Sequence, residues 1–304
     1  MNAVMAVLAG ILGLAVGSFL NVCIDRLPRG ESLVHSRSHC EGCRRQLAAG
    51  ELVPVLSYLV LRGRCRSCGA RIPRRLPYVE AATGLIFAGL YLAHGPTGVF
   101  ILLAAYTCIL IVVFVIDLEH GLILNKVVYP ALALALVVAA VVPPQWLGSF
   151  GPHPVVSAAA GAATGFALLF LVAVLSQLIY SRQSGGNDED PTAATEHGNG
   201  QTSGGAENQT QSHESPGEGD DTQTAMGWGD VKLAAFMGAA TGFPIIFVAL
   251  FVGIILGGVV GVLLLAFRKK GRKQAIPFGP FLAAGTMASL LWGSTILQWY
   301  LGLM

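Results

Sequence analysis

The sequence from residue 98 to residue 116 reads GVFILLAAYTCILIVVFVI and contains no charged side chain. A helix of this length covers about the same distance as the roughly 30 Å hydrocarbon core of a bilayer. The rest of the chain has the same character, because 54% of its 304 residues are hydrophobic and only 12% are charged. A soluble domain carries about 25% charged residues. We therefore expect a membrane protein rather than a soluble one.

Other apolar stretches of the chain are also long enough to cross a membrane. The apolar region 231–267 is divided at the turn signal Thr241-Gly242-Phe243-Pro244, which leaves its first half short. We predict an all-α polytopic membrane protein with about eight transmembrane helices. The predicted spans are 2–24, 78–94, 98–116, 127–143, 155–180, 231–243, 244–267 and 277–302.

The positively charged residues predict which loops face the cytoplasm. Eleven of the 19 lysines and arginines lie between Arg26 and Arg75, and five more lie between Arg268 and Lys273. The first span has no positive charge before it, so we expect an uncleaved anchor with its N-terminus outside. Counting eight spans from that end places both basic segments in the cytoplasm, as the positive-inside rule requires. The cytoplasmic location explains these basic residues, so we do not expect a nucleic-acid partner. We expect them to contact the anionic headgroups of the lipid bilayer.

Two Cys-x-x-Cys pairs lie in the first basic segment. Each pair can form a tight turn that points two thiolates at one ion, and two such turns complete a tetrahedral zinc site. Disulfides and a redox pair are the alternatives. The reducing cytosol disfavours disulfides, and two pairs in one loop favour a metal over a redox function. Four protein ligands leave no open position, so the zinc would be structural. We predict a small cytoplasmic zinc-binding domain over residues 25–77, with the ligands Cys40, Cys43, Cys65 and Cys68.

A polar segment over residues 181–225 separates the fifth predicted span from the sixth. It holds nine of the 17 acidic residues, together with many Gly, Ser, Thr, Asn and Gln residues. Such a composition cannot bury enough apolar surface to fold, so we expect a disordered acidic cytoplasmic loop. A tolerated insertion and a regulatory or docking segment are both compatible with it.

Two acidic residues stand at the ends of apolar helices. Asp117 closes the apolar run of the third span, and Asp230 directly precedes the sixth. Acids at a membrane face are costly and usually have a partner or a function. Gly227 and Gly229 precede Asp230 and permit another segment to approach closely. The predicted topology places both acids at the same depth, at cytoplasmic helix ends, which is the geometry that a pair of carboxylates needs.

Two carboxylates held together share a proton near neutral pH, because both cannot ionise easily. The ionised group can take a proton from water while the protonated group polarises a peptide carbonyl. This chemistry cleaves an amide bond without a metal, and we interpret the chain as a membrane-embedded aspartyl protease. One alternative is a transporter that uses the two aspartates as an ion or proton relay, although relay acids usually lie in mid-span. Another is an assembly factor with a degenerate protease site.

Several short motifs resemble those of the type IV prepilin leader peptidases, membrane aspartyl proteases with a Gly-x-Gly-Asp motif. The resemblance extends along nearly the whole chain and depends on the order and spacing of the motifs. It is carried by Gly17-Ser-Phe-Leu-Asn-Val22, Arg26-Leu-Pro28, the two cysteine pairs, residues 74–80, Ile116-Asp-Leu-Glu-His120, Gly227-Trp-Gly-Asp-Val-Lys232 and Pro277-Phe-Gly-Pro280.

The resemblance implies that Asp117 and Asp230 are the catalytic pair, with Gly227, Gly229 and Lys232 as motif support. It implies type IV prepilin or pseudopilin precursors as substrates, cut after a short basic leader at the cytoplasmic face of the bacterial inner membrane. It also implies methylation of the new N-terminus with S-adenosylmethionine, an activity associated with the cysteine-bearing loop. The chain shows no glycine-rich nucleotide-binding fingerprint, so this cofactor rests on the resemblance alone.

The chain departs from the family in two places. Many members have Leu-Pro-Asp shortly after the first catalytic acid, where this chain has Ile123-Leu124-Asn125. Asn125 cannot ionise, so this position cannot supply half of the pair. The acidic loop is also longer than expected, and its negative charge can attract a basic leader.

These predictions combine into one organisation of the chain. Residues 1–24 form the first transmembrane helix, 25–77 the zinc-binding domain, 78–180 helices two to five with Asp117, 181–225 the disordered acidic loop, and 226–304 helices six to eight with Asp230.

Overall fold

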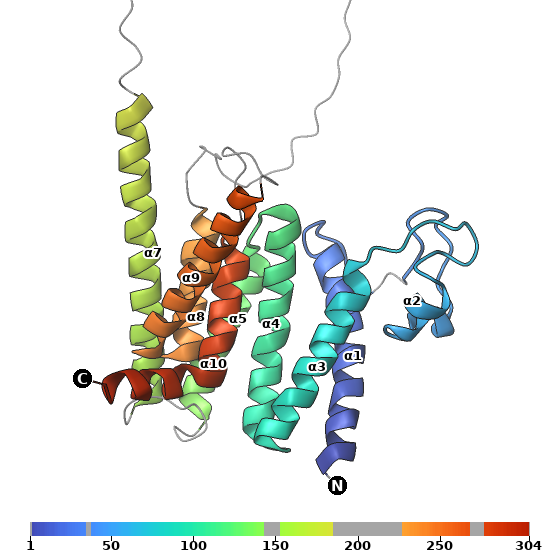
Figure 1. The fold of residues 1–304 in the computed structure, drawn as a ribbon, viewed down its shortest axis with the longest axis horizontal. Helices are drawn as coiled ribbons and strands as arrows, with labels where there is room; N and C mark the ends of the chain where they lie inside the picture. Colours follow the sequence, from blue (N-terminus) through green and yellow to red (C-terminus); the bar gives the residue numbers. More distant parts are fainter. Residues whose placement is uncertain (1, 35–37, 143–152, 185–226, 268–276, 304) are drawn as a thin grey trace, which may run out of the picture. The chain divides into compact units, whose positions relative to one another are not determined.

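The computed structural model describes residues 2–34, 38–142, 153–184, 227–267 and 277–303 (Figure 1). Over these residues the secondary structure is helical, with no strand beyond two isolated β-bridges in the cysteine-bearing segment. The all-α fold class is therefore confirmed. The helices are α1 (Asn2–Arg26), the 3-10 helix η1 (Ala49–Leu52), α2 (Leu56–Val60), α3 (Arg75–His94), α4 (Gly98–His120), α5 (Asn125–Val141), α7 (Pro154–Ser184), α8 (Trp228–Thr241), α9 (Ile245–Ala266) and α10 (Gly279–Leu301).

Each predicted span forms a helix, but the helices differ in length. Six of the described helices are long and apolar enough to cross a membrane, namely α1, α3, α4, α7, α9 and α10. The helix α5 has 17 residues and α8 has 14. Fourteen residues rise only about 21 Å, against a hydrocarbon core of roughly 30 Å. For α5 and α8 a complete crossing therefore stays a prediction.

The chain divides into two units. The first unit comprises residues 1–170 and 228–304, and all contacts discussed below lie within it. The second comprises residues 171–227, of which the structure describes the end of α7 and Gly227. The helix α7 ends at Ser184, slightly beyond the predicted start of the acidic loop, and residues 185–225 of that loop lie outside the described residues.

The hairpin of α3 and α4 fixes where the first acid lies. The helix α3 ends at Gly95, which has a φ of +63°. The Thr97 side chain then accepts a hydrogen bond from the Phe100 amide at 3.5 Å and caps the start of α4. The helix α4 stops at Gly121, whose φ of +64° suits a residue without a side chain. Asp117 consequently lies in the last turn of α4.

Glycines allow α1 and α3 to pack with their backbones close together. A Cβ atom on Gly13 would lie 2.8 Å from the Cα atom of Gly84, and one on Gly17 would lie 2.8 Å from the Cα atom of Glu80. Small residues at such crossings are the usual basis of helix association in lipid, where the hydrophobic effect gives no driving force between helices.

The helix α8 is the most deeply buried helix of the described chain. Five of its side chains are completely buried, namely those of Val231, Leu233, Ala234, Phe236 and Met237. It packs against α5, α9 and α10. A short helix that is apolar on all sides is expected in such a position, because its whole surface can be covered by neighbours.

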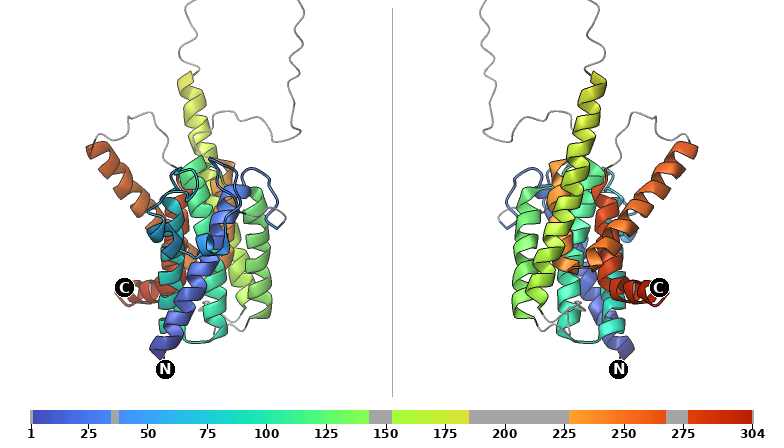
Figure 2. Two further views of the ribbon diagram at one scale, coloured as in Figure 1. Left: turned by 90° about the vertical axis from the view of Figure 1, so that its right-hand side faces the viewer. Right: turned by 90° about the vertical axis from the view of Figure 1, so that its left-hand side faces the viewer.

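The helix α9 is much more exposed than α8. Phe251 is 65% exposed and Val262 is 66% exposed. Figure 2 shows the C-terminal end of α9 leaning away from the other helices of the first unit. A helix with apolar side chains on its exposed faces suits contact with lipid rather than with water.

The crossing of α7 and α8 gives a test of the packing. A Cβ atom on Gly238 of α8 would collide with the backbone of Gly161 in α7. Gly238→Val should therefore lower stability by at least the roughly 1–3 kcal/mol that overpacking usually costs. Gly258→Val is the matched control, because no atom lies within 4 Å of a Cβ atom there. Unfolding temperatures in detergent compare the two variants, and equal values would contradict the tight crossing.

Candidate functional site

Asp117 is buried at the junction of α4 and α10. Only 4% of the residue is exposed, and its Oδ2 atom has no hydrogen-bond partner among the described residues. The backbone amide of Gly279, the first residue of α10, interacts with the carboxylate. A Cβ atom on Gly279 would lie 2.5 Å from Oδ2. Glycine at this position therefore allows the N-terminus of α10 to face the carboxylate, where the helix dipole favours negative charge.

Asp230 reaches the same end of the bundle from α8. It lies in the first turn of that helix and is half-buried. Gly229, which precedes Asp230, packs against Ile123, and so does Gly279, which lies against the Asp117 carboxylate. The two acids therefore lie at the same end of the bundle although α4 and α8 are far apart in the sequence. The geometry brings together the two acids that the sequence singles out.

Ile123 connects the motifs around the two acids. A Cβ atom on Gly229 would lie 2.7 Å from the Cβ atom of Ile123, and one on Gly279 would lie 3.2 Å from its Cδ1 atom. The close approach expected before Asp230 is therefore made by Gly229, whereas Gly227 is exposed. The Ile123 side chain, in the segment between α4 and α5, therefore lies between the start of α8 and the start of α10.

Lys232 binds the start of α5 from α8. Its Nζ atom donates a hydrogen bond to Oδ1 of Asn125 at 2.9 Å. The same atom lies 5.6 Å from the centre of the Tyr129 ring, within the range of a cation–π contact. Lys232 follows Asp230 by two residues, so these contacts hold the turn of α8 that carries the acid.

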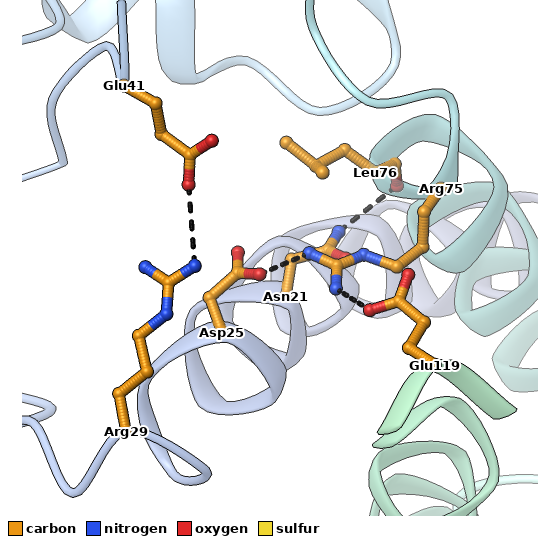
Figure 3. A network of polar contacts seen from close by, with 7 residues as sticks. All are labelled: Asn21, Asp25, Arg29, Glu41, Arg75, Leu76 and Glu119. Carbon is orange, nitrogen blue, oxygen red and sulfur yellow. Dashed lines mark hydrogen bonds and ion pairs between the residues drawn. The ribbon is translucent and has the colours of Figure 1, made fainter. Parts of the chain in front are cut away.

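An arginine joins the ends of three helices, one of which is the helix that carries Asp117 (Figure 3). Arg75, the first residue of α3, forms ion pairs of 2.6 Å with Asp25 of α1 and with Glu119 of α4. Nearby, the Asn21 side chain donates to the Leu76 carbonyl oxygen at 3.1 Å. Both carboxylates are partly exposed, and such pairs contribute only about 0–1 kcal/mol each. Their main effect is to fix the positions of the helix ends.

Sequence patterns did not reveal several of these contacts. Gly279 lies in one of the motifs that carry the family resemblance, but its position against Asp117 needs the tertiary structure. Ile123 is one apolar residue among many and carries no signal of its own. Asn125 stands out in the sequence only because it cannot ionise, whereas the structure shows it as the hydrogen-bond acceptor for Lys232.

The four predicted cysteine ligands form one cluster. Their sulfur atoms all lie within 4.8 Å of one another, and those of Cys40 and Cys68 are 3.7 Å apart. The two pairs have matching surroundings, because a β-bridge encloses each of them, His39 with Gln46 and Arg64 with Arg71. Four sulfur atoms gathered in this way can hold a metal ion.

Backbone amides favour the thiolate form of one ligand. Hydrogen bonds from the amides of Cys68 and Ser67 are the main cause that lowers the pKa of Cys65 to about 6. The neighbouring Cys68 thiol has its pKa raised to about 11, so the thiolate of this pair is favoured on Cys65. A thiolate is the form of cysteine that binds metal, so the folded segment is prepared for an ion.

The bound metal should depend on these cysteines and on pH. We expect Cys65→Ser to lose most of the metal, while Cys108→Ser in α4 keeps it, as measured by elemental analysis of the purified protein. Chelator competition should show affinity falling more steeply below pH 6, because protons then compete for the Cys65 thiolate as well. Full metal content in Cys65→Ser would contradict the site.

These features define a polytopic membrane protein with two acids at one end of its helix bundle and a four-cysteine segment beside it. Residues 11–94 match the model of the bacterial peptidase A24 N-terminal domain, and residues 103–262 match the model of the type IV leader peptidase family. The second match covers more than half of the chain. The chain belongs to the type IV leader peptidase family, as the motifs in its sequence predict.

Curated relatives align with nearly the whole chain. The prepilin leader peptidase/N-methyltransferase of Pseudomonas putida is 30% identical, with 95% of this chain and 91% of that protein aligned. The protein of the same name from Bacillus subtilis is 28% identical, with 96% of each chain aligned. That from Pseudomonas aeruginosa is 29% identical, with 96% of this chain and 91% of the relative aligned. No solved structure matches the chain.

Proposed function

We propose that this protein is a prepilin leader peptidase with Asp117 and Asp230 as its catalytic pair. The observation that carries the proposal is that the glycines beside these two acids, Gly229 and Gly279, both pack against Ile123 at one end of the bundle. Relatives named as prepilin leader peptidases share nearly the full length of the chain. Both acids lie in terminal helix turns rather than in mid-helix, which disfavours the alternative of an ion or proton relay.

The pair would act on water and on the scissile peptide together. The ionised carboxylate accepts a proton from water, and the protonated one donates a hydrogen bond to the peptide carbonyl. The Gly279 amide at the start of α10 supports the single negative charge that the pair retains. The two acids share this charge and titrate as one unit, so the roles of acid and base belong to the pair.

The position of the pair suits a substrate anchored in the membrane. The substrates proposed are type IV prepilin or pseudopilin precursors, in which a basic leader precedes an apolar helix. We place both acids at the cytoplasmic face of the bacterial inner membrane, because the basic segments of the sequence favour that orientation. The apolar helix of the precursor can then stay in the bilayer while its leader reaches the acids.

We assign a structural zinc ion to the four cysteines. A tetrahedral site with Zn–S bonds of about 2.3 Å places its sulfur atoms about 3.8 Å apart, close to the 3.7 Å between Cys40 and Cys68. Four thiolates satisfy the ion without an open position. Methylation of the new N-terminus, with S-adenosylmethionine as donor, is the second proposed activity. It rests on the names of the relatives rather than on a site in the structure.

Cleavage of a prepilin by the purified protein tests the pair. Asp117→Asn and Asp230→Asn should each lower kcat by about 10²–10⁴-fold, the usual contribution of general acid–base catalysis. Glu31→Gln is the control, an acid-to-amide change at an exposed residue outside the proposed site, and should stay near the wild-type rate. Mass spectrometry follows loss of the leader and, with S-adenosylmethionine present, gain of a methyl group. A rate near wild type in either aspartate variant would refute the pair.

Lys232 should affect catalysis through the position of Asp230. Because a misplacement of 1 Å can cost about 10²-fold in rate, we expect Lys232→Met to lower kcat by about ten- to a hundredfold. Asn125→Asp keeps an oxygen acceptor for the ammonium group and should retain activity. Kinetics of both variants provide the comparison. A wild-type kcat in Lys232→Met would show that the contact to Asn125 has no positioning effect.

A further inference from the structure

The cysteine-bearing segment exposes a group of apolar side chains that no described residue covers. They lie in η1, in α2 and between these two helices. Their exposed fractions are 44% for Leu52, 42% for Val53, 58% for Leu56, 65% for Leu59 and 73% for Val60. Five exposed apolar side chains within nine residues of a largely polar segment indicate contact with a membrane or with another molecule.

The buried acid Glu80 holds the start of α2 below the N-terminal end of α3. The Val55 amide, at the start of α2, donates a hydrogen bond to Oε2 of Glu80 at 2.7 Å. Glu80 is only 8% exposed and follows Arg75, the first residue of α3, by five residues. Five residues correspond to about 7.5 Å along a helix. The start of α2 therefore lies beside the second turn of α3, below the level at which that helix begins.

The arrangement in Figure 1 agrees with this depth. The helix α2 lies beside α3 and lower than its first turn. It lies on the side of α1 and α3 that faces away from α4, which carries Asp117. The helices α1 and α3 thus separate α2 from α4.

The surface of α3 at this level suits lipid. Tyr78 is 72% exposed and Leu85 is 75% exposed on a helix that is long and apolar enough to cross a membrane. Tyrosine is typical of the boundary between headgroups and acyl chains. The apolar surface of α2 therefore lies at the depth where the lipid-facing surface of α3 begins.

Exposed arginines follow α2 along the chain. They are Arg62, Arg64, Arg66, Arg71 and Arg74. Two acids of the segment have other basic partners, since Glu51 pairs with Arg45 at 2.7 Å and Glu41 lies 3.8 Å from Arg29. An apolar surface accompanied by arginines is the combination that binds an anionic lipid leaflet.

We propose that residues 52–60 form a membrane foot, which inserts into the leaflet on the side of the cysteine-bearing segment and binds it together with the arginines that follow. Acyl chains cover the apolar side chains, and anionic headgroups contact the guanidinium groups. Glu80 sets the depth of the foot. This interaction is independent of the peptidase chemistry and holds the metal-binding segment flat against the bilayer.

Photocrosslinking of the full chain in nanodiscs tests the membrane foot. The photoreactive residue p-benzoylphenylalanine replaces Leu59 in one protein and the exposed polar Gln46 in a matched control. The nanodiscs contain phosphatidylethanolamine and phosphatidylglycerol, and mass spectrometry identifies the adducts. We expect lipid adducts at position 59 in several-fold excess over position 46, with metal content equal to wild type as the check on folding.

Two results would overturn the proposal. One is an equal yield of lipid adducts at the two positions. The other is attachment of position 59 to a second copy of the chain or to added prepilin instead of lipid, which would make the surface a protein contact. In the same assay Glu80→Ala should reduce the lipid adducts, whereas Glu80→Gln, which keeps an acceptor oxygen, should preserve them. Unchanged adducts in Glu80→Ala would contradict the anchoring by Glu80.

Discussion

Close backbone contact at glycines holds the membrane helices of this protein together. Within a bilayer the hydrophobic effect no longer favours helix association, so short-range packing has to replace it. Gly13 and Gly17 bring α1 against α3, Gly238 brings α8 against α7, and Gly285 brings α10 against the carbonyl of Ala249 in α9. Each crossing fixes a helix along its length, and the ends of the helices are therefore fixed as well.

The proposed site uses these fixed ends. Asp117 lies in the last turn of α4, Asp230 lies in the first turn of α8, and Gly279 begins α10. Three helices therefore supply the groups rather than a loop. Sites on rigid elements hold their geometry better than sites on loops. The interactions next to the acids have the same effect, because Arg75 fixes the end of α4 and Lys232 fixes the start of α8.

The sequence predicts the elements of this structure better than their contacts. A long uncharged segment in lipid has to satisfy its own backbone hydrogen bonds, which favours a helix. The turn signal before Pro244 separates α8 from α9 where expected. Asp117 and Asp230 stand out because acids are rare in apolar surroundings. By contrast, the linear sequence does not show which acids Arg75 binds or that Gly279 faces Asp117. It also does not show that the start of α2 is hydrogen-bonded to Glu80. These contacts join residues far apart in the chain and depend on how the helices pack.

The ion pair between Asp25 and Arg75 gives the protein a modular character. These residues lie at the two ends of the cysteine-bearing segment, and their side chains meet at 2.6 Å. The segment is therefore a loop between α1 and α3 whose two ends are held together by the ion pair. Doubling the length of a flexible loop raises the entropic cost of bringing its ends together by only about 0.6 kcal/mol. A change in the length of this segment should therefore leave the helix ends of the bundle in the same place.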